Sequence, residues 1–170
     1  TDYFVNQSSL PKVYGGFNTS FSYKGVELSA IFAYSVGGYI MNRDITMILH
    51  NGSSAGRAWS KEILNRWTPE NRYTDVPALA TTTNNWTSYS TRFLQNNSYM
   101  RLKNLTLSYT LPKQLVSKAA LSNVQVFVQS DNLFTIHRNQ GLDPEQGITA
   151  LTYFRYPAMR SFTGGINVTF

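Results

Sequence analysis

The stretch that decides the fold is Ser161–Phe170, SFTGGINVTF, in which apolar and polar side chains alternate without a break. Side chains of a β-strand point to opposite faces in turn, so this alternation predicts one apolar face and one face of small polar residues. A soluble sandwich strand has the same period, but an apolar face kept up to a final aromatic residue is typical of the closing strand of a transmembrane β-barrel.

The composition of the 170-residue chain suits a membrane wall better than a soluble core. Charged residues make up 14% of it, well below the roughly 25% of a typical soluble domain. Aromatic residues also make up 14%, and cysteine is absent. No run of about 20 apolar residues occurs, so the sequence predicts spanning by strands rather than by a helix.

Four further segments alternate in the same way and are predicted strands: residues 12–23, 26–38, 99–110 and 124–134. Lys24-Gly25 joins the first two as a tight hairpin, because glycine accepts the positive φ that such turns need. The connections are in turn short, long, short and long. Short periplasmic turns and long extracellular loops are typical of outer-membrane barrels. The expected fold class is therefore all-β, an antiparallel transmembrane β-barrel segment of about five strands.

Two connections carry helical signals. Trp59, Ile63 and Trp67 recur at positions i, i+4 and i+8, which predicts a short helix over residues 57–67 with these three side chains on one face. Residues 113–120, between two predicted strands, are expected to form one or two helical turns.

The basic residues divide between the two ends of the predicted strands. All nine arginines lie in the predicted long loops or at the strand ends beside them, whereas the short turns carry only lysine. Arg101 and Lys103 share the face of Leu105, so we expect them near or above the membrane edge. Guanidinium groups bind phosphate bidentately, so outer-membrane lipid or loop carboxylates are expected partners, with a merely solvated loop as the alternative.

Several functions are excluded by what the sequence lacks. The formal net charge of +6 forms no basic cluster, and the aromatic residues follow strand spacing, so no nucleic-acid partner is expected. His50 and His137 lie far apart without a carboxylate at ligand spacing, so we expect no metal and no cofactor. Asp143 and Glu145, within Asp-Pro-Glu, are interpreted as turn chemistry. No phosphate loop or nucleophile elbow occurs, and an enzyme is not expected.

The largest predicted loop carries aromatic side chains that are candidates for contact with a substrate or a partner protein. Aromatic faces suit sugars and peptides, and Trp and Tyr also anchor protein interfaces. Packing of the loop onto itself is the alternative. The candidates are Trp59, Trp67, Tyr73, Trp86 and Tyr89.

Several segments resemble the C-terminal part of SusC/RagA-type TonB-dependent transporters. They are residues 10–35 (LPKVYGGFNTSFSYKGVELSAIFAYS), 63–71 (ILNRWTPEN), 98–113 (SYMRLKNLTLSYTLPK), 131–134 (DNLF), 141–145 (GLDPE) and 167–170 (NVTF). The resemblance covers nearly the whole chain apart from the loop interiors. It implies that residues 1–170 form the last part of a 22-stranded barrel in the outer membrane of a Gram-negative bacterium, without its plug domain.

The resemblance also implies a function and partners. Such transporters import oligosaccharides or oligopeptides, draw energy from TonB through an N-terminal part that this sequence lacks, and pair with a SusD-like surface lipoprotein that acts as a lid. Five strands cannot close such a barrel, so the plug and the other strands of the same transporter are expected partners. The competing interpretation is a secreted soluble β-sandwich that binds carbohydrate.

The last predicted strand carries a further expectation. Its apolar face resembles the assembly signal that the barrel-insertion machinery reads, and a lipid-anchoring aromatic is the alternative for its final residue. The signal residues are Phe162, Ile166, Val168 and Phe170.

Overall fold

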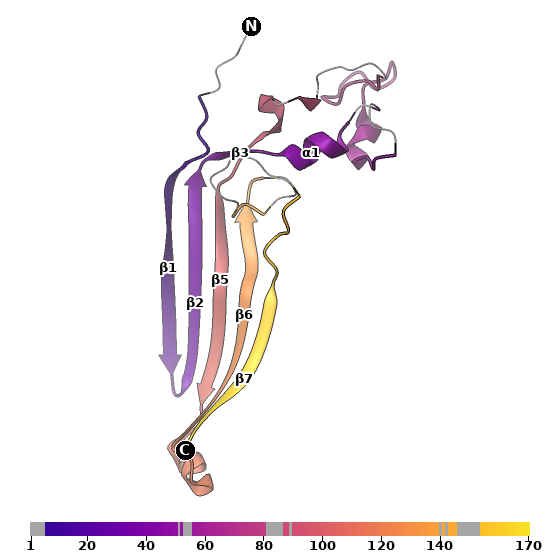
Figure 1. Cartoon of the computed structure of the whole chain (residues 1–170). Helices are drawn as coiled ribbons and strands as arrows, with labels where there is room; N and C mark the ends of the chain where they lie inside the picture. The colour runs from indigo at the N-terminus through magenta and orange to yellow at the C-terminus, as the bar shows by residue number, and fades with distance from the viewer. Residues whose placement is uncertain are drawn as a thin grey trace.

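The computed structural model describes residues 6–50, 52, 56–80, 87–88, 90–139, 141, 143–145 and 154–170. Five strands form one antiparallel sheet in the order β1-β2-β5-β6-β7. In the part of the chain that the structure describes, no helix or second sheet covers either face of this sheet (Figure 1). Each predicted strand is confirmed to within three residues of its ends: β1 (Pro11–Tyr23), β2 (Val26–Gly37), β5 (Tyr99–Thr110), β6 (Asn123–His137) and β7 (Ser161–Thr169).

The connections between strands alternate as predicted. Lys24-Gly25 and residues 111–122 reverse the chain at one end of the sheet, which we call the turn end, and the last residue lies there too (Figure 1). Residues 38–98 and 138–160 connect strands at the opposite end, the loop end. Residues 111–122 include helix α2 (Lys113–Val116) and a 3₁₀ turn (Ser117–Ala119), so the predicted helical turns are confirmed.

The β1–β2 hairpin has the turn that its sequence predicts. Lys24 has φ 47° and Gly25 has φ 86°, and positive φ at both central residues is the mark of the type I′ turn that matches the twist of paired strands. A Cβ atom at Gly25 would lie 2.7 Å from the carbonyl oxygen of Thr110 on β5, so glycine is needed there for space as well as for conformation.

Cross-strand pairing aligns the apolar residues of all five strands on one face, which we call the apolar face. Phe21 pairs with Leu28, Leu28 with Leu107, and Leu107 with Val128. These side chains are not packed away, since Phe21 is 68% exposed and Leu107 50% exposed. Strand alternation puts the following apolar residues on this face: Val13, Phe17, Phe21, Leu28, Phe32, Leu107, Val126 and Ile166.

The opposite face of the sheet, the polar face, carries mostly small, amide and charged side chains, with a few larger ones such as Tyr14, Ile31 and Phe127. One row across it contains Ser22, Glu27, Ser108, Phe127 and Gly165. A hollow of about 310 Å³, which we call the basin, lies on this face near the turn end. The predicted division into two faces is therefore confirmed, and no second sheet of the kind a sandwich needs packs on the apolar face among the described residues.

A bulge in β5 reverses the side-chain alternation near the loop end. Ile31 pairs with Asn104 but Phe32 pairs with Leu102, which leaves Lys103 as an extra residue in β5. The extra residue shifts the alternation by one, so the residues of β5 beyond it lie on the face opposite to the one that regular alternation from Leu105 would give. Strand β6 has a matching irregularity across from Lys103, where residue 132 has φ 51°.

The bulge corrects one expectation about the charged residues. Arg101 pairs with Ala33 on the polar face, and Leu102 pairs with Phe32 on the apolar face. The prediction that Arg101 and Lys103 share the face of Leu105 is therefore wrong. The alternation alone could not indicate this, because a bulge becomes visible only against the neighbouring strand.

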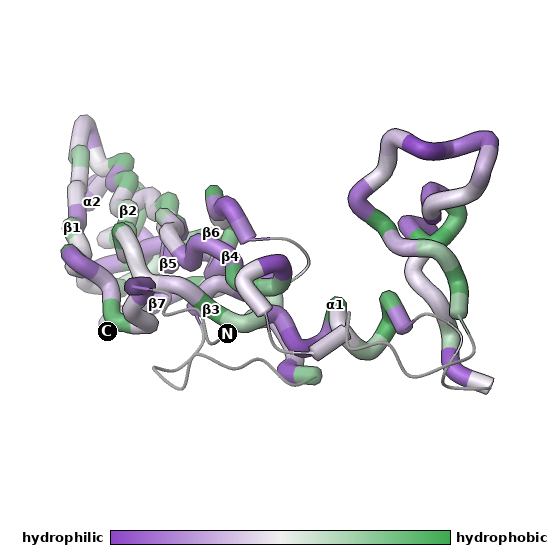
Figure 2. Tube along the Cα trace, turned by 90° about the horizontal axis from the view of Figure 1, so that it is seen from above, coloured by the Kyte–Doolittle hydropathy of each residue, from purple (hydrophilic) through white to green (hydrophobic). Residues whose placement is uncertain are grey.

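The loop between β2 and β5 folds into a small unit at the loop end, which we call the loop unit. Strands β3 (Tyr39–Met41) and β4 (Leu94–Asn96) form a two-stranded ribbon, and helix α1 (Arg43–Ile48) follows β3. This unit projects sideways from the sheet, as Figure 1 and the view along the strands in Figure 2 agree. Its buried apolar residues are Ile40, Leu49, Ile63, Val76 and Phe93.

The predicted helix over residues 57–67 is wrong. The chain forms only a 3₁₀ helix, Lys61–Asn65, which Ser60 caps by accepting a hydrogen bond from the backbone N–H of Glu62. Ile63 is buried with 3% exposure, whereas Trp59 is 45% and Trp67 43% exposed, so the three side chains do not share one buried face.

Among the described residues, no helix is long and apolar enough to cross a membrane.

Candidate functional site

A cluster of four charged side chains lies at the loop end of the polar face. The bulge places Arg101 on the polar face, and the loop between β6 and β7 brings two carboxylates within reach of its guanidinium. The Arg101 guanidinium pairs with Asp143 and, at 2.7 Å, with Glu145, and its Nε donates to the Thr135 hydroxyl on β6. The Arg101 and Asp143 side chains are 4% and 7% exposed. Lys103 also pairs with Glu145. We call Arg101, Lys103, Asp143 and Glu145 the charge cluster.

Asp143 is held by backbone donors as well as by the guanidinium. Its carboxylate accepts hydrogen bonds from the N–H groups of Glu145 (2.9 Å) and Ala158 (2.7 Å). Burial raises the pKa of Asp143, but these two backbone hydrogen bonds and the Arg101 guanidinium outweigh it, so the pKa lies below its ordinary value. Asp143 is therefore ionised at neutral pH. Its carboxylate connects Arg101 of β5 to the backbone at Glu145 and at Ala158, in the loop between β6 and β7.

Asparagine side chains extend this connection. Asn97 donates to the carbonyl oxygen of Pro144 (2.9 Å), and Asn139 donates to the side-chain oxygen of Asn97 (3.0 Å). Asn139 is buried. The two loops at the loop end are thus hydrogen-bonded to each other through part-buried side chains.

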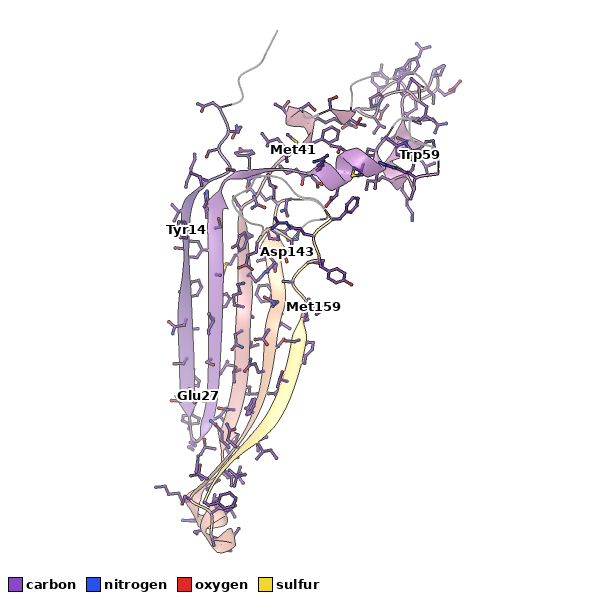
Figure 3. All side chains as sticks on the ribbon, viewed as in Figure 1. Tyr14, Glu27, Met41, Trp59, Asp143 and Met159 are labelled. Carbon is purple, nitrogen blue, oxygen red and sulfur yellow. The ribbon has the colours of Figure 1, made fainter. Side chains whose placement is uncertain are left out.

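A pocket of about 410 Å³ lies between β6 and residues 157–160. It opens because the β6–β7 pairing stops at Asp131 and Ser161 while β6 continues to His137. Arg101 and Asp143 form part of its lining, and Figure 3 places Asp143 at the loop end above β6. The charge cluster therefore holds the loop between β6 and β7 against the sheet, and two of its residues also line this pocket.

The candidate aromatic residues that the structure describes are spread over the loop unit. The Trp59 indole N–H donates to Nδ1 of the buried His50 at 2.8 Å, so this side chain is partly fixed by packing. Trp67 is 43% exposed and Tyr73 is fully exposed. Figure 3 places Trp59 far to the side of the strands. Trp86 and Tyr89 lie outside the described residues.

The predicted assembly-signal residues and the two histidines were also located in the structure. Phe162, Ile166 and Val168 lie on the apolar face of β7, and Phe170 is exposed at the turn end. His50 belongs to the loop unit and His137 ends β6, where its Nδ1 lies 2.9 Å from the carbonyl oxygen of Asn139. Neither histidine belongs to a group of three possible metal ligands among the described residues.

Sequence reasoning missed the charge cluster. Asp143 does make the turn that its sequence predicts, since its side chain accepts from the N–H two residues on. Loop carboxylates were expected partners of the arginines, but the particular pairing of Arg101 with Asp143 and Glu145 was not predicted. The one signal available was the pair of cations in β5 that interrupts an otherwise apolar face.

Comparison with known proteins places this architecture. No protein-family model matches the chain. The chain is 36% identical over 166 residues to TonB-dependent receptor P3 of Formosa agariphila, which covers 91% of this chain and 16% of the relative. It is 29% identical over 179 aligned residues to TonB-dependent receptor P26 of the same organism, covering 99% of this chain and 18% of the relative.

Solved structures agree with the sequence relatives. A structure of the RagAB peptide transporter matches with a TM-score of 0.88 and 34% identity, over 98% of this chain and 18% of that chain. The same importer in its closed-closed state matches with a TM-score of 0.87. The chain therefore spans less than a fifth of the length of the proteins that it matches.

Removing the Arg101 side chain should release the loop between β6 and β7. In Arg101→Gln the buried Asp143 loses its countercharge, and breaking a buried pair costs about 3–5 kcal/mol. We expect the backbone amides of Glu145 and Ala158 to lose at least tenfold of their hydrogen-exchange protection. Arg92→Gln is the control, because Arg92 pairs with an Asp75 side chain that is 88% exposed. Equal losses at the same two amides in both variants would contradict the assignment.

The connection through Asp143 should survive moderate acid. A carboxyl with a lowered pKa contributes stability above its unfolded value of about 3.9, and the contribution is lost as pH falls through the lower folded value. Protection of the Ala158 amide, corrected for intrinsic exchange, should thus be unchanged from about pH 7 to about pH 5 and should fall only below about pH 4. Opening of the loop between pH 7 and 5 would count against this account.

Proposed function

The chain belongs to the SusC/RagA type of TonB-dependent receptor, and from this we propose that it forms part of the wall of a transporter that imports oligomeric nutrients across the outer membrane. TonB-dependent receptors are β-barrel proteins of the outer membrane, so the apolar face would meet lipid and the polar face the barrel interior. The loop end would then lie outside the cell and the turn end in the periplasm.

The observation that carries the proposal is the apolar face. It extends from the turn end to the loop end with only small polar residues such as Thr19 and Ser130 within it, and the bulge at Lys103 keeps Leu102 on this face where the alternation changes. A strand of 12 residues such as β5 extends about 40 Å, which becomes about 28 Å at a tilt of about 45°. This height matches an apolar band of about 25 Å in an outer-membrane wall.

The rest of the transporter would supply what these strands lack. Strands β1 and β7 are the edges of the sheet, and open edges are not tolerated in lipid, so neighbouring strands of the same barrel would pair with them. We propose that residues 1–170 are the C-terminal part of that barrel. A plug domain and the segment that contacts TonB would belong to the preceding part of the transporter.

The proposed substrates are oligosaccharides or oligopeptides, taken up together with a SusD-like surface lipoprotein. The similar solved structure is that of the RagAB peptide transporter, and this similarity supports oligopeptides as the substrate. The projecting loop unit, with exposed aromatic side chains, supports contact between this chain and a lid, because Trp and Tyr anchor protein interfaces.

A charged substitution on the apolar face should abolish assembly, whereas its neighbour should tolerate one. Leu107→Arg would place a cation against lipid at a cost of up to about 2–4 kcal/mol. Thr106→Arg is the matched control, because Thr106 is adjacent and lines the basin on the polar face. In the full-length transporter we expect the outer-membrane level to fall sharply for Leu107→Arg only, and growth of that variant on an imported oligosaccharide or peptide to fall with it.

Equal tolerance of both arginines would contradict a lipid-facing wall. Full solubility of the protein without detergent would favour the soluble sandwich instead.

The lid proposal predicts which loop aromatics matter. Tyr73→Ala and Trp67→Ala, at exposed positions, should each weaken binding of the purified lid lipoprotein to the full-length transporter by about tenfold. Trp59→Ala would combine such a loss with disturbed packing on His50, and Trp86 and Tyr89 remain candidates. Leu64→Ala is the control, an exposed aliphatic residue of the same loop. Unchanged lid affinity in both Tyr73→Ala and Trp67→Ala would leave packing as the role of these residues.

The final aromatic residue should act in assembly rather than in stability. Deletion of Phe170 should reduce the inserted fraction of the full-length transporter several-fold, while the molecules that do insert keep their resistance to heat and urea. Phe21→Leu, on the apolar face of β1 and outside the signal residues, is the control for loss of an exposed aromatic. Parallel losses of insertion and stability would identify Phe170 as a lipid anchor only.

A further inference from the structure

A buried histidine holds an indole ring in the loop unit. His50, just beyond α1, is 5% exposed, and its Nδ1 accepts a hydrogen bond of 2.8 Å from the indole N–H of Trp59. The two ring centroids lie 5.3 Å apart, with the ring planes tilted by 53°. The backbone brings the same two segments together, because the N–H of Ser60 donates to the carbonyl oxygen of Ile48 at 2.8 Å. The contact between the two rings is therefore part of the fold of the loop unit.

This hydrogen bond requires a neutral imidazole. A ring nitrogen accepts only while it carries no proton, so in this arrangement Nδ1 of His50 is bare and the proton of the neutral ring lies on Nε2. Nε2 is buried and has no hydrogen-bond partner among the described residues. Protonation would place a second N–H where the indole N–H of Trp59 points, and it would put a positive charge in a buried position. The protonated ring and the observed contact are therefore incompatible.

The charged groups around the pair would not neutralise a protonated ring. They belong to α1, to the segment that carries Trp59 and the 3₁₀ helix after it, and to the 3₁₀ turn Thr91–Phe93: Arg43, Asp44, Arg57, Lys61, Glu62 and Arg92. Cations outnumber carboxylates in this set. Of the two carboxylates, Asp44 accepts from the backbone N–H of Phe154 at 2.8 Å, and Glu62 is exposed to solvent. Residues 51–55 add no charge. The described carboxylates therefore leave the ring without a counterion.

We propose that the His50–Trp59 pair is a pH-sensitive switch, which holds the indole ring at neutral pH and releases it as the pH falls. Histidine ordinarily titrates near pH 6.5. The hydrogen bond supports only the neutral ring, so the contact stabilises the loop unit above that range and is lost as the pH falls through it. Trp59 is already 45% exposed, so little burial opposes the release of its ring.

The switch would act on the contact with the lid, and this consequence rests on the proposed function above, which makes Trp59 a candidate for that contact. A ring that is held in one orientation loses less conformational freedom when a partner binds it. Acid should therefore weaken the contact between the loop unit and the lid lipoprotein. We expect the affinity of the full-length transporter for the lid to fall about three- to tenfold between about pH 7.5 and about pH 5.5.

Fluorine NMR of the detergent-solubilised full-length transporter, labelled with fluorotryptophan, tests the switch directly. The Trp59 signal is identified by its absence in Trp59→Phe, and we expect it to shift as the pH falls from about 7.5 to about 5.5. The Trp67 signal should stay in place, because this ring belongs to the same unit and contacts no histidine ring among the described residues.

Two histidine variants provide a matched pair. His50→Asn keeps a side-chain oxygen that can accept from the indole N–H but cannot take up a proton in this range, so the Trp59 signal should lose its pH response. The lid affinity of this variant should stay within about twofold over the same pH range. His137→Asn removes the other histidine of the chain, which lies at the end of β6, and should respond as the wild type does.

The outcomes separate the switch from the function on which its consequence rests. A Trp59 signal that does not respond to pH, or that responds equally in His50→Asn, would overturn the switch. Loss of the response in His137→Asn would overturn it too, as would parallel shifts of Trp59 and Trp67, since the loop unit would then open as a whole. A normal Trp59 response with unchanged lid affinity would support the switch and contradict the lid contact. Failure of the transporter function itself would appear separately, as tolerance of Leu107→Arg.

Discussion

Cross-strand register fixes the face of every side chain in this sheet, and the rest of the structure depends on it. Side chains alternate with a period of two, so a slip of one residue would move a whole strand's apolar set to the polar side. Here five strands keep their apolar residues aligned, as in the row of Phe21, Leu28, Leu107 and Val128. A single-layer sheet has no second layer against which to bury its apolar side chains. Its stability as a barrel wall therefore depends on keeping apolar residues on the lipid side and polar residues on the water side.

The bulge at Lys103 shows how the wall accommodates a charged site without breaking this rule. If β5 alternated regularly through Lys103, with no bulge, Arg101 would lie on the apolar face with Leu105. With the bulge, Arg101 lies on the polar face and Leu102 continues the apolar one. The buried guanidinium is then matched by Asp143, Glu145 and Thr135, because an unpaired buried charge would be costly. The same irregularity therefore preserves the lipid-facing surface and fastens the loop that precedes β7.

The sequence predicted those parts of the fold that depend on local pattern. Strand boundaries, the Lys24-Gly25 turn and the two faces all follow from alternation and from glycine, which one chain segment reveals by itself. The bulge does not, because it is defined by pairing between β5 and β2. The Arg101–Asp143 pair joins residues 42 positions apart, and nothing in either segment indicates the other. The predicted helix around Ile63 is wrong for a related reason. The spacing of Trp59, Ile63 and Trp67 fits a helix, but it cannot show that only Ile63 is buried while the two tryptophans are partly exposed.

Two glycines show how the sheet positions its aromatic rings on both sides. On the apolar face, a Cβ atom at Gly15 would lie 3.0 Å from the Tyr34 hydroxyl oxygen, and on the polar face one at Gly165 would meet the Phe127 ring at 2.7 Å. In each pair the glycine is the direct cross-strand partner of the aromatic residue, so the ring covers backbone that has no side chain of its own. On the apolar face such a ring adds to the surface that meets lipid. On the polar face, where the neighbours are amides and hydroxyls, the same packing covers the backbone of β7 with an apolar ring, so the glycine fixes where that ring can lie.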